Sequence, residues 1–117
     1  MRHANKNRTL SRTRSQRTAL LRGLAISLIR DGQIMTTKAK AKELQPYIER
    51  LITIAKQDTS VTRRTVAARL GEPAPTTIKK LFTEVAPRFK ERAGGYTRIV
   101  KIGSTAGREE AVIAFVE

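Results

Sequence analysis

A helix followed at once by a strand is encoded in residues 20–37, which read LLRGLAISLIRDGQIMTT. Apolar side chains from Leu20 to Ile29 recur at spacings of three and four, the pattern of one buried helix face. Gly32 follows them and suits the left-handed conformation that ends many helices. Residues 33–37 then predict a short strand. The stretch therefore predicts a helix that leads directly into the first strand.

Three further helices are expected after this strand. Thr37 is suited to cap a helix over residues 38–57, in which Pro46 predicts a kink or an irregular turn. A third helix is predicted over residues 61–70, and a fourth is predicted to end before Pro87.

The last third of the chain changes to the pattern of strands. Residues 96–102 and 111–116 are rich in β-branched side chains and predict two strands, joined by a hairpin loop over residues 103–108. The order is helix, strand, three helices, strand, strand. It predicts one domain, residues 1–117, of the α/β (α+β) class, with helices packed on a small three-stranded mixed sheet.

The amino-terminal segment is strongly basic. Seven of the 24 Lys and Arg residues and none of the ten acidic residues lie within residues 1–22, and the whole chain has a formal net charge of +14. Such a block repels itself and is stabilised beside a polyanion. We therefore expect residues 1–22 to form a basic arm that binds nucleic acid and leads into the first helix. The alternatives are a merely solvated charged face and a cleavable leader, although the apolar residues run from the arm straight into the body.

The first helix has a face that is apolar at one end and cationic at the other. Steps of three and four lead from Leu28 and Leu24 back to Arg17, Arg14 and Leu10, which predicts a helix over residues 10–30. Burying Arg14 and Arg17 on the core without partners would be costly. We expect the carboxy-terminal half of this helix to dock on the body and its amino-terminal half to project.

Enzyme chemistry has little support in the sequence. The chain has one histidine, His3, and no cysteine, so a thiolate nucleophile and a cysteine-based zinc site are excluded. Glu109 and Glu110 are adjacent on a predicted strand and point to opposite faces, which makes them a poor proton-sharing pair. No stretch approaches the ~20 apolar residues of a membrane span. We expect no catalysis, cofactor, metal, small-molecule substrate or membrane contact; the rival hypothesis is a small phosphate-handling enzyme.

A second candidate contact is the segment RAGGYTR, residues 92–98. Gly94 and Gly95 expose backbone amides that phosphate can approach closely, and Arg92 and Arg98 flank them. Tyr96 either contacts RNA through its ring or hydroxyl or belongs to the core, and the sequence leaves both readings open. With few aromatic residues, the chain is expected to recognise phosphate, sugar and shape rather than splayed bases.

Six stretches carry a resemblance to a known family. They are MRH at 1–3, IMTTKAKAKEL at 34–44, LITIAK at 51–56, RR at 63–64, PRF at 87–89 and RAGGYTRI at 92–99. In their order and spacing, the chain resembles the bacterial large-subunit ribosomal protein L-seventeen family from end to end. Pro46 and the EPAP connection at 72–75 depart from the family pattern. The resemblance implies an α/β fold with a small mixed sheet, binding to large-subunit ribosomal RNA, and no catalysis.

The resemblance also implies contacts with neighbouring large-subunit ribosomal proteins, L-thirty-two among them, on a cytoplasmic or organellar ribosome. We expect a structural constituent of the large subunit that binds ribosomal RNA; the alternative is a nucleoid-type DNA-binding protein. We call the turn around Gly94 and Gly95 the glycine turn. The expected RNA-binding residues fall in the arm, at the start of the second helix and in or beside the glycine turn: Arg2, His3, Lys6, Arg8, Arg12, Arg14, Arg17, Arg22, Lys38, Lys40, Lys42, Arg92, Gly94, Gly95, Tyr96 and Arg98.

Overall fold

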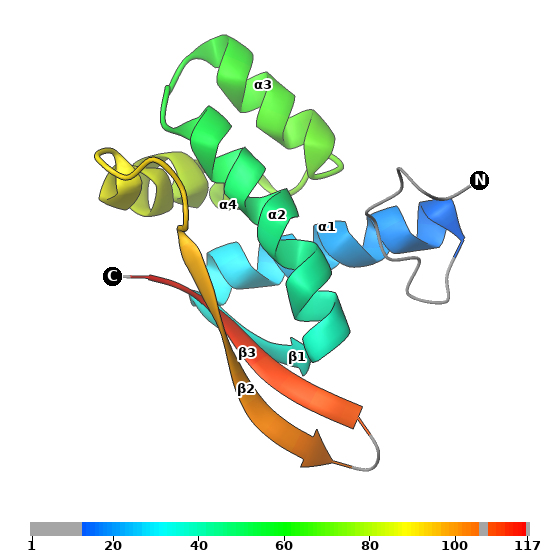
Figure 1. The fold of residues 1–117 in the computed structure, drawn as a ribbon. Coiled ribbons are helices and arrows are strands. Elements are labelled where there is room, and N and C mark those ends of the chain that lie inside the picture. The colour runs from blue at the N-terminus through cyan, green and yellow to red at the C-terminus, as the bar shows by residue number, and fades with distance from the viewer. Residues whose placement is uncertain (1–12, 106–107, 117) are drawn as a thin grey trace, which may run out of the picture.

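The computed structural model describes residues 13–105 and 108–116, with only the backbone described at Thr105. The elements follow in the order α1 (Arg14–Asp31), β1 (Gln33–Thr37), α2 (Lys38–Ala55), α3 (Ser60–Arg69), α4 (Pro75–Lys80), β2 (Thr97–Thr105) and β3 (Arg108–Phe115). Helices cover one face of a three-stranded sheet, and α2 crosses between the sheet and α3 (Figure 1). The predicted α+β class is confirmed.

The sheet is antiparallel throughout, so the prediction of a mixed sheet was wrong. Its strand order is β1-β3-β2, and β3 pairs antiparallel with both neighbours. The two edge strands therefore run in the same direction, but β3 separates them and no parallel pair forms. The strands are also longer than predicted, because β2 extends to Thr105 and β3 begins at Arg108. Most of the residues predicted to form the loop between them therefore belong to the paired strands. The pairing of β2 with β3 shifts in register between Lys101 and Gly103, and Gly103 adopts a φ of 134° at this irregularity.

The predicted helix signals at residues 32 and 37 are confirmed. Gly32 adopts φ of 81° and its amide donates to the Leu28 carbonyl, while the Thr37 hydroxyl accepts from the Lys40 amide. Helix α1 begins at Arg14 rather than at residue 10, because the Thr13 hydroxyl caps it there. Helix α2 continues through Pro46.

The fourth helix differs most from expectation. Helix α4 ends at Lys80. The chain then forms a π turn over Leu81–Val85, followed by a 3₁₀ turn over Ala86–Phe89. Pro87 was predicted to lie beyond the helix. It is instead accommodated near the start of the 3₁₀ turn, where its missing N–H is not needed.

The buried side chains form a core between α2 and its neighbours. Helix α2 contributes the largest share, with Leu44, Ile48, Leu51 and Ile52 at 0–1% exposed. The sheet adds Ala111, Ile113 and Phe115 from alternate positions of β3, and Phe89 of the 3₁₀ turn also belongs to the core. This core holds the amino-terminal halves of α1 and α2 and the glycine turn in fixed positions on the surface.

Candidate nucleic-acid interface

The amino-terminal end of α1 presents Arg14 to solvent. Thr13, Arg14, Ser15 and Gln16 are all exposed, and this end of α1 extends past α2 (Figure 1). The first turn holds no acidic residue. Arg14 therefore lies at the positive end of the helix dipole, where a cation is unfavourable and an anion is stabilised. This geometry agrees with the predicted projecting end.

Arg17 is engaged within the protein. Its Nη1 lies 3.6 Å from Oε1 of Glu43 on α2, and the Glu43 side chain is only 8% exposed. The expectation that Arg17 would find no partner on the body was therefore wrong. The partner was missed because Glu43 lies 26 positions along the chain and only the packing of α1 on α2 brings the two together.

We expect Arg17→Gln to lower the free energy of unfolding by about 2 kcal/mol, because it removes a guanidinium that pairs with the buried Glu43 carboxylate. Thermal or urea unfolding measures this. Arg14→Gln, three residues away and exposed, is the matched control and should change stability by less than about 0.5 kcal/mol. Adding Glu43→Gln should restore part of the loss. Equal melting of the two single variants would contradict a structural role for the pair.

Arg22 also has an internal role. Its Nε donates to the Arg69 carbonyl at 3.0 Å and its Nη2 approaches the Ala68 carbonyl at 3.5 Å, so it caps the carboxy-terminal end of α3. The same side chain lies against Gly71, where an added Cβ would come within 3.1 Å of the Arg22 Cδ. Gly71 has φ of 77°, a second reason for glycine there. Arg22 thus fastens α3 to α1.

Two arginines that the sequence analysis missed lie beside this junction. The Tyr47 hydroxyl donates to the Arg69 carbonyl at 2.6 Å. Burial raises the pKa of Tyr47, although the charges of Arg22, Arg69 and Arg50 around it favour the ionised form. The side chains of Arg50 and Arg69 are exposed. Neither has a local sequence signal, because each stands singly on a helix surface.

These residues connect the two contacts predicted from the sequence. Arg14 and Arg22 line one hollow on α1, together with Thr18. Arg50, Arg69 and Gly94 line a second hollow, which has Pro46 and Ile54 among its walls. Arg22 joins the two through its bond to the Arg69 carbonyl. We call the set Arg14, Arg22, Arg69 and Arg50, which ends at Gly94, the arginine strip.

The glycine turn is exposed, whereas Tyr96 belongs to the core. Tyr96 is 1% exposed, its hydroxyl lies 3.2 Å from that of Thr53, and Lys56 lies over its ring at 4.7 Å. The ring is therefore not available for stacking on a base. Of the two interpretations that the sequence left open, the structure agrees with Tyr96 as a core residue. Gly94 and Gly95 have φ of 155° and 65°.

The two arginines of this turn differ in their contacts. The Arg92 Nη1 donates to the Gly95 carbonyl at 3.1 Å, and the Arg92 carbonyl accepts from the Lys56 ammonium. Arg92 thus supports the turn, yet it remains exposed, as does Arg98 on β2. The Arg92 guanidinium therefore stays accessible to an anion beside Gly94 and Gly95, and Arg98 is exposed on the strand that follows the turn.

The lysines at the start of α2 form a separate group. Lys38 pairs with Glu109 of β3, Nζ to Oε2 at 3.2 Å, Lys40 is half-buried and Lys42 is exposed. The remaining predicted contacts, Arg2, His3, Lys6, Arg8 and Arg12, lie outside the described residues, and the arm stays a prediction. Within residues 13–105 and 108–116, no group of three or more His, Asp or Glu side chains is placed to hold a metal ion. No helix in that part of the chain is both long and apolar enough to cross a membrane.

The fold and this surface define a small, strongly basic α+β protein with exposed arginines on one surface. A family model described as Ribosomal protein L17 matches residues 20–117. The chain therefore belongs to the ribosomal protein L17 family of the large ribosomal subunit. This family consists of ribosomal structural proteins and is generally non-enzymatic.

Three curated relatives carry the name "Large ribosomal subunit protein bL17". The protein of Sulfurihydrogenibium sp. (strain YO3AOP1) is 48% identical over 120 residues, covering 100% of this chain and 98% of the relative. That of Sphingopyxis alaskensis is 48% identical over 117 residues, covering 100% and 82%. That of Campylobacter concisus is 50% identical over 117 residues, covering 100% and 97%. The predicted family resemblance is confirmed.

Proposed function

We propose that this chain is a structural constituent of the large ribosomal subunit that binds ribosomal RNA through the arginine strip and the glycine turn. The observation that carries the proposal is the strip itself, a set of arginines from α1, α2 and α3 that line two hollows, linked by the bond of Arg22 to the Arg69 carbonyl, beside exposed backbone at Gly94. Arginine forms bidentate contacts with phosphate. The backbone N–H groups of a glycine turn can also donate hydrogen bonds to a phosphate that approaches closely.

The exposed members of the arginine strip contact RNA phosphates; Arg22 of the strip and Arg17 outside it are bonded within the protein and position them. Arg14, Arg50 and Arg69 are exposed and form the first group. Arg22 and Arg17 hold α1 against α3 and α2, which sets the spacing between the others. The predicted arm, residues 1–12, adds further phosphate contacts beyond Arg14. Recognition on this scheme depends on phosphate positions and RNA shape rather than on base edges.

The proposed partners are the large-subunit ribosomal RNA and neighbouring ribosomal proteins, including L-thirty-two, on a cytoplasmic ribosome. The alternative of a nucleoid-type DNA-binding protein has no support, because the matching family is ribosomal. A small phosphate-handling enzyme is disfavoured for the same reason.

Salt washing of ribosomal subunits tests this function. The tagged protein should sediment with the large subunit, remain stoichiometric with other large-subunit proteins through moderate salt, and dissociate at high salt as phosphate contacts are screened. Recovery with chromosomal DNA, or loss from the subunit in the first low-salt wash, would contradict the proposal.

A further inference from the structure

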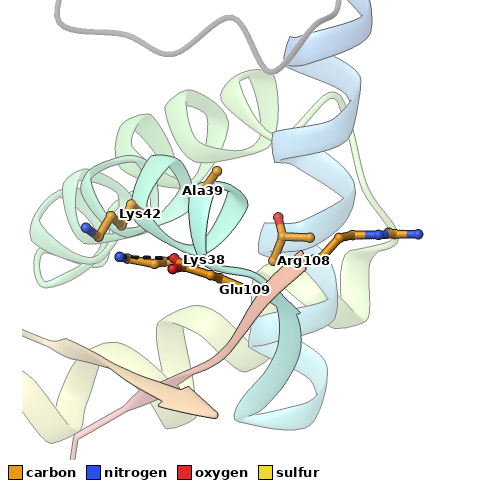
Figure 2. Close-up of a pocket in the computed structure, with 6 residues that line it drawn as sticks. Lys38, Ala39, Lys42, Arg108 and Glu109 are labelled. Carbon is orange, nitrogen blue, oxygen red and sulfur yellow. Dashed lines mark ion pairs between the residues drawn. The ribbon is translucent and has the colours of Figure 1, made fainter. Parts of the chain in front are cut away.

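Three lysines lie near Glu109 where α2 begins. Lys38 and Lys42 are one helical turn apart on α2, and both extend in the same direction (Figure 2). Glu109 of β3 meets Lys38 at 3.2 Å, whereas Arg108 points away from this pair. The third lysine, Lys101 on β2, lies close enough to Lys38 to interact with it. We call Lys38, Lys42 and Lys101 the lysine cluster.

The ammonium groups of the lysine cluster repel one another. The contact with Lys38 lowers the pKa of Lys101, and the charges of Lys38 and Lys42 lower it further. In contrast, the pKa of Lys38 is raised, chiefly by its hydrogen bond to Glu109. Glu109 pairs with Lys38 and its charge also acts on Lys101, but at Lys101 the repulsion from Lys38 and Lys42 is the larger effect.

The fold gives no reason for this accumulation of positive charge. The first turn of α2 holds no acidic residue, and its lysines lie at the positive end of the helix dipole. Lys42 and Lys101 are exposed, so neither fills a place in the core. Such an arrangement is unfavourable in the isolated protein and becomes favourable when an anion joins it.

The surface around the cluster offers room for that anion. A hollow between α2 and β3 is lined by Lys38, Ala39, Lys42 and Glu109, which are among the residues drawn in Figure 2. An adjoining hollow is lined by Lys38, Lys101 and Gly103 together with the two carboxylates Glu109 and Glu110. The two hollows share Lys38 and Glu109, so a ligand that displaced Glu109 would meet all three ammonium groups.

We propose that the lysine cluster binds a backbone phosphate of RNA and that Glu109 is an internal counter-ion, which the phosphate displaces from Lys38. The Glu109 side chain is 64% exposed, so it can turn into solvent when the phosphate arrives. This inference rests on the proposed RNA-binding function and adds Lys101, which the sequence analysis did not select. Strand β2 begins at Thr97, after the glycine turn, and Lys101 lies four positions farther along it, about 13 Å at 3.3 Å per residue, so the two sites hold different phosphates.

Paired charge variants test the proposal through effects of opposite sign. Full-length large-subunit ribosomal RNA, transcribed in vitro, is titrated by filter binding from 50 to 200 mM salt. Lys101→Gln should flatten the log–log salt slope by about one, so that its affinity falls about threefold less than that of the wild type over this range. At every salt concentration in this range, the affinity of Lys101→Gln for the RNA should be lower than that of the wild type. Glu109→Gln should strengthen binding by about threefold, because the phosphate no longer competes with a carboxylate.

Matched variants outside the cluster separate a specific site from a general effect of net charge. Lys79→Gln on α4 and Glu84→Gln in the turn after it make the same charge changes at exposed positions. If Lys101→Gln binds like Lys79→Gln, and Glu109→Gln like Glu84→Gln, the cluster is only an intramolecular ion-pair group and the proposal is wrong.

Two other results are distinguishable from that failure. Normal RNA binding by Lys101→Gln together with poor incorporation into the subunit would assign the cluster to an acidic protein neighbour and would overturn the RNA site. Absence of RNA binding by the wild type would overturn the proposed function itself, whatever the variants do.

Discussion

Replacing Tyr96 with Ala is expected to lower the free energy of unfolding by about 3–5 kcal/mol, the usual cost of removing a large buried aromatic side chain. Tyr96 is 1% exposed and its ring centroid lies 5.2 Å from that of Phe89. The truncation leaves a cavity between the Phe89 ring and α2. Thermal unfolding should show a midpoint lowered by about 10–20 °C.

Two milder variants distinguish a core role for Tyr96 from an RNA contact. Tyr96→Phe removes only the hydroxyl that meets Thr53, and should cost about 1 kcal/mol. Tyr96→Leu removes the ring while keeping the site apolar. Both should bind ribosomal RNA with wild-type affinity at a temperature where they are folded. A loss of affinity in either folded variant would restore the reading in which Tyr96 contacts RNA.

Local signals predicted the helices and their ends well. The spacing of apolar residues identified the buried faces of α1 and α2, and Thr37 and Gly32 marked ends that the structure confirms. These features depend on residues within one or two turns of each other. The boundaries near Pro87 and Gly103 were missed, because a 3₁₀ turn and a strand irregularity tolerate the residues that end ordinary helices and strands.

The strand directions could not be read from the same signals. Each strand was recognisable, but which strand lies in the centre depends on how the hairpin of β2 and β3 docks beside β1. Placing β3 between the other two makes every pair antiparallel. Nothing within β1 or β2 specifies that order.

The sequence predicted that a surface rich in basic residues exists, but it identified only some of the residues that are exposed on it. Charge density selected Arg14 correctly as an exposed cation at a helix start, but it also selected Arg17 and Arg22, which bond within the protein. It passed over Arg50 and Arg69, because an isolated arginine on a helix resembles any solvated charge. Tertiary contacts between residues 47 positions apart decide which cations remain available.

The largest expected effect on RNA binding comes from the exposed part of the arginine strip. Changing Arg14, Arg50 and Arg69 together to Gln removes about three phosphate contacts. Between 50 and 200 mM salt the wild type should therefore lose about 40-fold more affinity than the triple variant, since each contact contributes close to one unit of slope. Stability should change by less than about 1 kcal/mol, because all three side chains are exposed.

A second triple variant with the same loss of charge controls for net charge. Arg64, Lys79 and Lys90 are exposed and lie outside the arginine strip. Changing them to Gln should leave most of the salt slope in place. Unfolding curves for both triple variants establish that the comparison is made between folded proteins.

The salt dependence of binding to large-subunit ribosomal RNA is the most direct test that the arginine strip is the RNA-binding surface. A plot of the logarithm of the association constant against the logarithm of salt concentration should flatten by about three units in the strip variant. It should stay close to the wild type in the control variant. Equal slopes for the two triple variants, with both proteins folded, would contradict the account.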